Sequence, residues 1–237
     1  MSGRNDRRGN DRRKNSRYDP IGRRPNRGRS PPSRDRDTPE KEDLSGFVKI
    51  SRHDESARVG GKIAWNARRG ENLPILASGA AAIYKAMEAT AAARRFLGQD
   101  DRPLELVCQP AFRAENKLAS MAIYFSTLKK RYEDVLDSKT VISVSKKSNP
   151  VVVAGAIAAR VRERSNPLVT AIGEEAVCNA IMAIGRTRLY LEDDNLDVRF
   201  VAVVEEAELK GGDGRWSYVT TMRFRLYGEE VGEDEDD

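Results

Sequence analysis

The residue types that most enzyme chemistry requires are scarce in this chain of 237 residues. His53 is the single histidine, so the sequence lacks the histidines that a multi-histidine zinc site needs and has only one that could activate a nucleophile. The segment Gly60–Lys62 is followed by Ile63 and lacks the upstream glycine of a phosphate-binding P-loop. The glycines at 211–214 indicate a turn, with no helix pattern after them. We therefore expect a protein that is not an enzyme, with no metal and no cofactor.

Basic residues suited to phosphate contact are abundant instead, and they gather near the N-terminus. Residues 1–36 contain 13 Lys or Arg against 4 Asp or Glu, and only Lys14 among these bases is a lysine. Guanidinium groups pair with phosphates and stack on exposed bases, so this bias favours contact with RNA. A membrane surface or an acidic protein is the alternative partner. The candidate contact residues here are Arg12, Arg13, Arg23, Arg24, Arg27 and Arg29.

The distribution of apolar residues and cysteines also indicates where in the cell the protein is located. No stretch approaches the roughly 18 consecutive apolar residues that span a bilayer, and the N-terminus has no apolar region typical of a secretory signal. Cys108 and Cys178 have no paired spacing, which suits a reducing environment. We expect a cytoplasmic or nuclear protein with no membrane partner.

The folded part of the chain repeats itself at a shift of 94 positions, without a gap over about sixty residues. Coinciding residues include Gly61 with Gly155, Arg68 with Arg162, Gly79 with Gly173, Arg94 with Arg188, and Val107 with Val201. The flanks have too little apolar surface to fold and are predicted to be disordered or solvated. The predicted units are an arm (1–43), a first module (44–127), a linker (128–138), a second module (139–227) and an acidic tail (228–237).

Each module is predicted to form strand, helix, strand, helix, strand, strand, which is an α+β fold. In the second module the β-branched segment 140–145 indicates a strand, and the helix that follows begins near Asn149 and Pro150. Helical stripes are formed by Val153, Ile157 and Val161, and, after Gly173, by Val177, Ile181, Ile184 and Leu191. Further strands of the second module are expected at 168–172, 198–204 and 218–226. The first module has equivalent strands at 47–52, 73–78, 104–109 and 119–127 and equivalent helices at 57–69 and 80–97.

Several motifs of the second module together resemble a known family. They are Ser145–Pro150, Val153–Ala158, Arg162–Arg164, Ala171–Gly173 and Ala180–Ile184. These motifs closely resemble the bacterial stage V sporulation protein S family, which is related to the archaeal chromatin and RNA-binding protein Alba. The resemblance covers nearly all of 139–204 and, more weakly, 47–127. It implies two tandem βαβαββ Alba-like modules that self-associate and bind DNA or RNA through the first loop, the start of the second helix and the β-hairpin.

The loop after the first strand of each module is the leading candidate for phosphate contact. Lys146 and Lys147 occupy it in the second module, and Arg52 with His53 occupies it in the first. Cations in such a loop can contact phosphates or can simply be solvated. The two hairpins contribute the remaining candidates, which are Lys210, Arg215, Arg113 and Lys117.

The tryptophans and two glycines each allow more than one interpretation. Trp216, beside the second hairpin, can stack on a base or close the edge of the core, and the packing role is favoured. Trp65 is predicted to pack in the core or between the modules. Gly79 and Gly173 indicate either close packing or a special backbone conformation at strand-to-helix turns.

Two functional hypotheses remain. The first is a non-catalytic nucleic-acid-binding protein that prefers RNA to DNA, whose modules form an internal pseudo-dimer, with a homodimer as a further option. The second is an assembly subunit of a ribonucleoprotein or other large complex, whose modules contact proteins. The acidic helix start at Glu174 and Glu175 favours the second hypothesis, and the arginine-rich arm with Lys146 and Lys147 favours the first.

Overall fold

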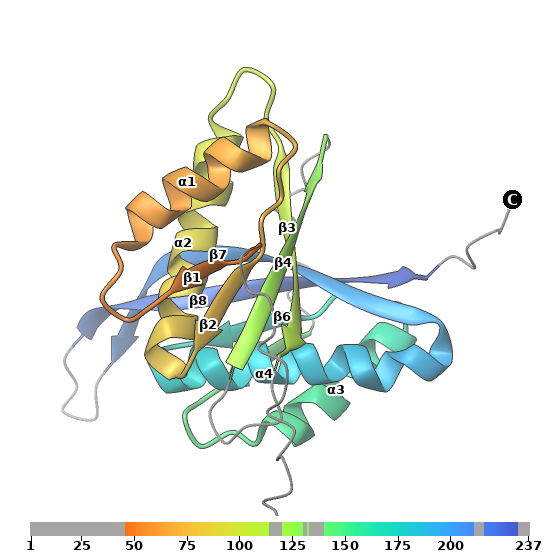
Figure 1. Ribbon diagram of the computed structural model, residues 1–237. Helices are drawn as coiled ribbons and strands as arrows, with labels where there is room; N and C mark the ends of the chain where they lie inside the picture. Colours follow the sequence, from red (N-terminus) through yellow and green to blue (C-terminus); the bar gives the residue numbers. More distant parts are fainter. Residues whose placement is uncertain (1–45, 114–119, 130–131, 133–139, 211–215, 232–237) are drawn as a thin grey trace, which may run out of the picture. The chain divides into compact units, whose positions relative to one another are not determined.

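Two βαβαββ modules follow one another along the chain in the computed structural model, which describes residues 46–113, 120–129, 132, 140–210 and 216–231 (Figure 1). The predicted fold class and the tandem modules are confirmed, and the arm lies outside the described residues. Module 1 comprises β1 (Val48–Ile50), α1 (Ser56–Arg68), β2 (Ile75–Ser78), α2 (Ala80–Gly98), β3 (Glu105–Phe112) and β4 (Ser120–Leu128). Module 2 comprises β5 (Val141–Val144), α3 (Pro150–Arg162), β6 (Leu168–Ala171), α4 (Glu174–Leu191), the 3-10 turn η1 (Glu192–Asp194), β7 (Leu196–Lys210) and β8 (Trp216–Glu230).

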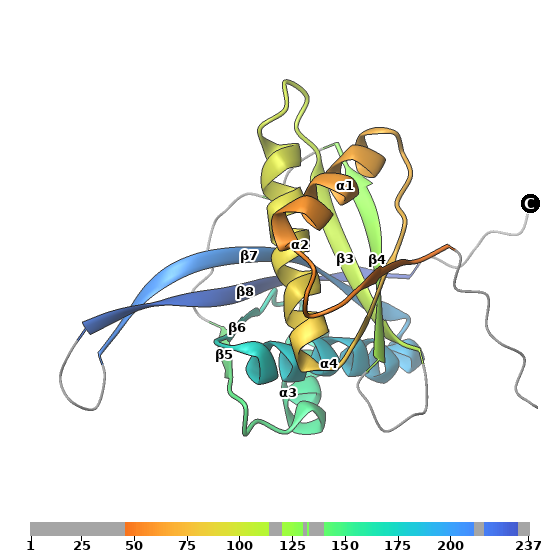
Figure 2. The same cartoon turned by 60° about the vertical axis from the view of Figure 1, so that its left-hand side comes forward.

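The strands of both modules form one eight-stranded sheet with the order β1-β2-β4-β3-β7-β8-β6-β5. At the centre of the sheet, β3 of module 1 pairs with β7 of module 2 in antiparallel fashion. From this pair outward, the corresponding strands of the two modules follow in the same order. Cys108 lies opposite Phe200 in that pairing. The β3–β4 and β7–β8 hairpins cross at a steep angle in Figures 1 and 2, so the sheet is strongly twisted at the junction.

The helices pack in pairs, α1 on α2 and α3 on α4, and α2 also packs against α4 across the two modules. The predicted helical stripes are buried, including Ile157 in α3 and Ile181 and Ile184 in α4. They meet alternate strand residues such as Phe200 and Phe224, whose rings form an edge-to-face pair with centroids 5.4 Å apart. Apolar burial on this scale is the main source of stability for both modules.

Strands β7 and β8 are much longer than predicted, because each continues well past the residues that face the core. The sequence placed them at 198–204 and 218–226, whereas their ladder runs from Leu196 opposite Glu230 to Lys210 opposite Trp216. Beyond Val204 and Met222, the side of the strands that faced the core carries polar residues such as Glu206 and Thr220, so the apolar pattern ends before the strands do. The backbone ladder continues without a core, and Figure 2 shows it as a projecting ribbon.

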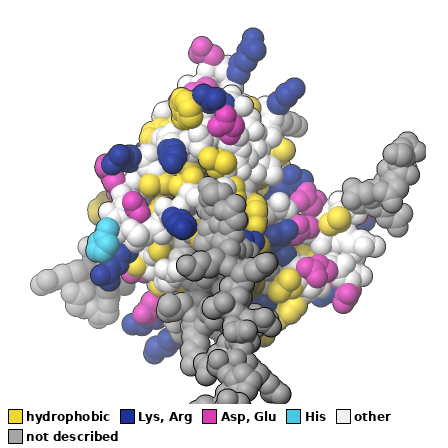
Figure 3. Space-filling model, viewed as in Figure 1, with side chains coloured by type: hydrophobic (Ala, Val, Ile, Leu, Met, Phe, Trp, Pro, Cys, Tyr) yellow, Lys and Arg dark blue, Asp and Glu magenta, His cyan; other side chains and the backbone are white. Residues whose placement is uncertain are grey.

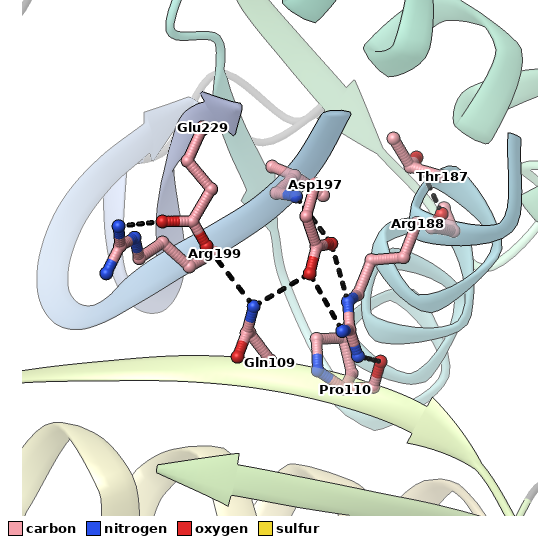
Figure 4. Close-up of polar contacts among 9 residues, drawn as sticks. Gln109, Pro110, Thr187, Arg188, Asp197, Arg199 and Glu229 are labelled. Atoms are coloured by element: carbon pink, nitrogen blue, oxygen red, sulfur yellow. Dashed lines mark hydrogen bonds and ion pairs between the residues drawn. The ribbon is translucent and has the colours of Figure 1, made fainter. Parts of the chain in front are cut away.

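Polar side chains tie β3 of module 1 to module 2 at the junction (Figure 4). Gln109 Nε2 donates to Asp197 Oδ2 at 2.9 Å and to Glu229 Oε1 at 3.4 Å. Arg188 of α4 pairs with the same Asp197 through Nε at 2.8 Å, and its Nη1 donates to the carbonyl of Pro110 at 3.2 Å. The junction therefore has directional contacts in addition to its strand pairing.

The alignment of Arg68 with Arg162 in the sequence repeat has a structural explanation. Arg68 pairs with Asp100 at 2.7 Å and Arg162 Nε donates to Asp194 at 2.8 Å. Each guanidinium also donates to a carbonyl near the end of the neighbouring long helix, that of Phe96 or Tyr190. In both modules this arginine joins the short helix to the end of the long one.

Gly79 and Gly173 precede the two long helices with nearly identical backbone angles, φ +86° and ψ 161° against φ +85° and ψ 164°. A Cβ added at either position would meet no atom within 4 Å. Of the two interpretations, the special conformation therefore holds and close packing does not. This backbone region is accessible almost only to glycine.

We predict that Gly79→Ala and Gly173→Ala each lower the free energy of unfolding by about 1–3 kcal/mol, because alanine is strained at these angles. Gly155→Ala is the control, since Gly155 is exposed inside α3 and a Cβ there also meets nothing within 4 Å. That change is expected to raise the free energy of unfolding by up to about 1 kcal/mol. Urea denaturation followed by circular dichroism measures all three, and equal midpoints for Gly155→Ala and Gly173→Ala would contradict the prediction.

Candidate nucleic-acid interface

The loop between β5 and α3 presents Lys146 and Lys147, both exposed, from a hydrogen-bonded turn. The amide of Ser145 donates to Oγ of Ser148 at 2.9 Å, and the amide of Lys147 donates to Oγ of Ser145 at 3.2 Å. Asn149 then caps α3, as predicted, by accepting a hydrogen bond from the amide of Val151 at 2.9 Å. The two cations are thus carried by a defined turn rather than by a long flexible loop.

Asn179 in α4 fastens this turn to the body of module 2. Its Nδ2 donates to the carbonyls of Ser145 and Lys146, both at 3.2 Å. Sequence reasoning missed Asn179, because a lone asparagine in a helix gives no signal until the loop is seen to pack on it. At the matching position in module 1, Lys85 pairs instead with Glu88 at 2.7 Å.

The loop between β1 and α1 forms a matching turn with a different closing group. The amide of Ser51 donates to Oδ2 of Asp54 at 2.6 Å, where module 2 uses the hydroxyl of Ser148. Arg52 and His53 lie at its exposed tip, and Nε of Arg52 donates to Nε2 of His53 at 3.0 Å. The hydrogen bonds from the amide and hydroxyl of Ser51 hold the pKa of Asp54 below its usual value.

This difference predicts that the two turns respond differently to acid. With its pKa lowered in the folded protein, Asp54 contributes stability above its unfolded pKa of about 3.9, and that contribution is lost as the pH falls through the lower folded value. The amide proton of Ser51 should therefore shift in NMR spectra with a midpoint below about 3.9, and that of Ser145 should not titrate. A Ser51 midpoint at or above the ordinary aspartate value would contradict this expectation.

The starts of the two long helices differ in charge, as the sequence indicates. Glu174 and Glu175 lie in the first turn of α4, and both are exposed, whereas the first turn of α2 carries no acidic residue. Lys85, one turn into α2, is paired with Glu88, and Ser56 of α1 donates to the same carboxylate at 2.7 Å. Of the regions implied by the family resemblance, the helix starts are therefore the least suited to phosphate.

The projecting end of the β7–β8 ribbon places Trp216 and Tyr218 in solvent. Trp216 is 66% exposed and Tyr218 is 72% exposed, so the prediction that Trp216 closes the core edge is wrong. The reason is the length of the ribbon: Trp216 lies opposite Lys210 at its far end, beyond the last buried residues near Met222. Arg215 lies outside the described residues.

Trp65 is also more exposed than predicted. It is 54% exposed on α1, and the guanidinium of Arg69 lies 4.5 Å from its ring centroid. The buried face of α1 is formed by other residues, including Gly60, Ile63 and Ala67, so the tryptophan lies outside the stripe that packs on α2. The prediction of core or module-interface packing is therefore wrong for this residue.

The remaining candidates differ in how far the structure describes them. Arg113 follows β3 and is half-buried, with its guanidinium 4.9 Å from the ring centroid of Phe47. Lys117 and the six arginines of the arm lie outside the described residues. On the face in Figure 3, Lys and Arg side chains are interspersed with Asp and Glu side chains. The structure thus brings Lys146 and Lys147 together on one turn and leaves Arg52 on the matching turn of the other module.

Membrane spans and metal clusters are both missing from the described part of the chain. None of its helices is long and apolar enough to cross a membrane. Among the same residues, no three His, Cys, Asp or Glu side chains are grouped so that they could hold a metal ion.

The fold and its turns define a tandem α+β protein built from two Alba-like modules that share one sheet. A family model described as Stage V sporulation protein S (SpoVS) matches residues 46–123 and again residues 140–229. The chain therefore belongs to the stage V sporulation protein S family and contains two copies of its domain. No curated protein matches the sequence significantly.

Proposed function

We propose that this protein is a non-catalytic nucleic-acid-binding protein that prefers RNA. The turn that carries Lys146 and Lys147 supports this most directly, because Asn179 and the serine hydrogen bonds hold two exposed cations at one place on a folded module. Cations held in this way can set the register of a phosphate backbone. The arginine-rich arm adds affinity without fixed geometry.

The pairing of the modules supports a second part of the proposal, an internal pseudo-dimer. The β3–β7 pairing and the packing of α2 on α4 give each module a partner within the same chain. The matching turns at Arg52 and at Lys146 then belong to one covalently linked unit. Residues 44–227 are expected to sediment as a monomer or as a dimer of such units, and open-ended polymers would contradict this part.

An assembly role is the alternative, favoured by the acidic start of α4. Glu174 and Glu175 would repel phosphate at a place where the family resemblance implies contact. If this alternative holds, the modules bind proteins and only the arm contacts nucleic acid.

Binding of single-stranded RNA and duplex DNA as a function of salt tests the proposal. Deleting residues 1–43 should weaken binding and flatten the slope of log affinity against log salt by roughly 0.7 for each phosphate of a single strand that the arm had neutralised. If the modules also bind, the truncated protein retains affinity, and Lys146→Glu with Lys147→Glu removes most of it.

The control is Lys62→Glu with Arg102→Glu, which changes the net charge equally at two positions away from the β5–α3 turn. Two results together would contradict the proposal. The truncated protein would bind nothing near physiological salt, and the full-length Lys146→Glu and Lys147→Glu variant would bind like the wild type. Only the arm would then bind nucleic acid. The assembly role would then replace the proposal.

A further inference from the structure

One side of the projecting β7–β8 ribbon combines exposed aromatic rings with carboxylates. Residues of a strand alternate between the two sides of a sheet, and the cross-strand pairs Glu206–Thr220 and Glu208–Tyr218 lie on the same side. Trp216 lies two residues before Tyr218 on β8 and therefore on that side as well. We call the surface formed by Val204, Glu206, Glu208, Trp216 and Tyr218 the ribbon face. It continues the core-facing side of the sheet beyond the buried residue Met222.

The carboxylates on the ribbon face are available to a cation. Glu208 accepts a hydrogen bond from the Tyr218 hydroxyl, which raises the pKa of that tyrosine and holds the ring and the carboxylate side by side. Glu206 is exposed and makes no ion pair within the described part of the chain. On the opposite side of the ribbon, Glu205 differs because Arg223 pairs with it at 2.6 Å.

This chemistry selects against phosphate and for guanidinium. Two carboxylates beside the rings repel a phosphate backbone. An arginine side chain, in contrast, can lie over an indole or phenol ring while its N–H groups donate to a neighbouring carboxylate. The ribbon face thus has the opposite preference from the Lys146–Lys147 turn.

The chain carries a ligand of this chemistry in its own arm. Residues 1–36 contain 12 arginines among their 13 bases, with 4 acidic residues. The 45 residues before Gly46 are long enough to reach distant parts of the domain, since an extended chain of that length spans up to about 150 Å. Charge complementarity and length therefore agree on one occupant.

We propose that the ribbon face binds arginines of residues 1–36 of the same chain. This inference goes beyond the proposed function and does not depend on it. Its consequence is competition: an arginine held between Glu206 or Glu208 and an aromatic ring is withdrawn from nucleic acid. The acidic ribbon then limits how freely the arm binds RNA.

Limited trypsin digestion of the full-length protein tests this inference, because trypsin cleaves after arginine and a bound arm is protected. Glu206→Gln with Glu208→Gln should speed cleavage within residues 1–36 by about three- to tenfold at low salt. The difference should vanish at about 0.5 M salt, where screening releases the arm in every variant. Trp216→Ser with Tyr218→Ser should also speed cleavage, since it removes the rings and leaves the carboxylates.

The control is Glu192→Gln with Asp193→Asn, which removes two exposed carboxylates from η1 and should leave the cleavage rate unchanged. Wild-type rates in both ribbon variants would overturn the inference. So would faster cleavage on deleting residues 232–237 without any effect of the ribbon variants, because the acidic tail would then hold the arm. Protection that weakens as the protein is diluted would overturn binding within one chain.

RNA binding by the same variants separates this inference from the proposed function. If both hold, Glu206→Gln with Glu208→Gln binds single-stranded RNA more tightly than the wild type. If the wild type binds no nucleic acid, the proposed function fails, and faster cleavage in the ribbon variants still supports the docked arm.

Discussion

Arg94→Leu is expected to lower the free energy of unfolding by about 3–5 kcal/mol, because it removes one partner of a buried ion pair. Arg94 of α2 binds Glu105 of β3 through two hydrogen bonds, from Nε at 2.5 Å and from Nη2 at 2.9 Å. The Glu105 side chain is fully buried, and Arg94 is only 8% exposed. Glu105 also accepts a hydrogen bond from the amide of Tyr132, so the pair connects α2, β3 and the segment after β4.

Arg188→Leu at the matching position of module 2 is the control. Arg188 pairs with Asp197, but these side chains are 27% and 17% exposed, so water can solvate the carboxylate that remains. We expect a loss smaller than that of Arg94→Leu. Arg94→Leu with Glu105→Leu should recover most of the loss, since the double variant removes both charges of this pair. Urea denaturation measures the three variants, and an Arg94→Leu midpoint equal to that of Arg188→Leu would contradict this explanation.

This pair shows where sequence reasoning stopped. The shift of 94 positions aligns Arg94 with Arg188, but it aligns Glu105 with Arg199 and not with Asp197. The arginine is thus repeated while its acidic partner comes from a different strand position in each module. A repeat can predict that a position recurs, but its partner depends on how the strands are placed in three dimensions.

The elements themselves followed from local patterns. The repeat located α2, predicted at 80–97 as the equivalent of the long helix after Gly173 and observed as Ala80–Gly98. Helical periodicity located that second helix, whose predicted stripe of Val177, Ile181, Ile184 and Leu191 is buried. Asn149 and Pro150 located the start of α3 through capping chemistry. The β3–β7 junction could not be predicted in this way, since no local pattern states which strand edge another strand will join.

The candidate site could also be predicted only in part from the sequence. The Lys146–Lys147 turn was located from its place between a strand and a helix, whereas its attachment through Asn179 needed the fold. Trp65 and Trp216 were misjudged because aromatic residues in regular elements usually pack against a core. Here one lies off the buried stripe of α1 and the other lies on a ribbon that extends past the core.

Phe200→Ala is expected to cost about 3–5 kcal/mol and to loosen both modules. Phe200 is fully buried, packs edge-to-face on Phe224, and lies opposite Cys108 of module 1 at the pairing that joins the sheet. Removing its ring leaves a cavity at the junction, so amide protons of β4 in module 1 should lose protection against exchange, although the substitution is in module 2.

Leu226→Ala is the matched comparison, because Leu226 is equally buried in module 2 but lies on β8, which pairs with β7 and β6 and not with a strand of module 1. Its cost is expected within the range of about 2–5 kcal/mol, with the loss of protection concentrated in module 2. If both substitutions lower protection in β4 equally for the same loss of stability, the domain unfolds as one unit and the junction has no special role. If Phe200→Ala leaves β4 unchanged, the modules are independently stable, and each would have to hold its half of the sheet without the strand pairing that joins them.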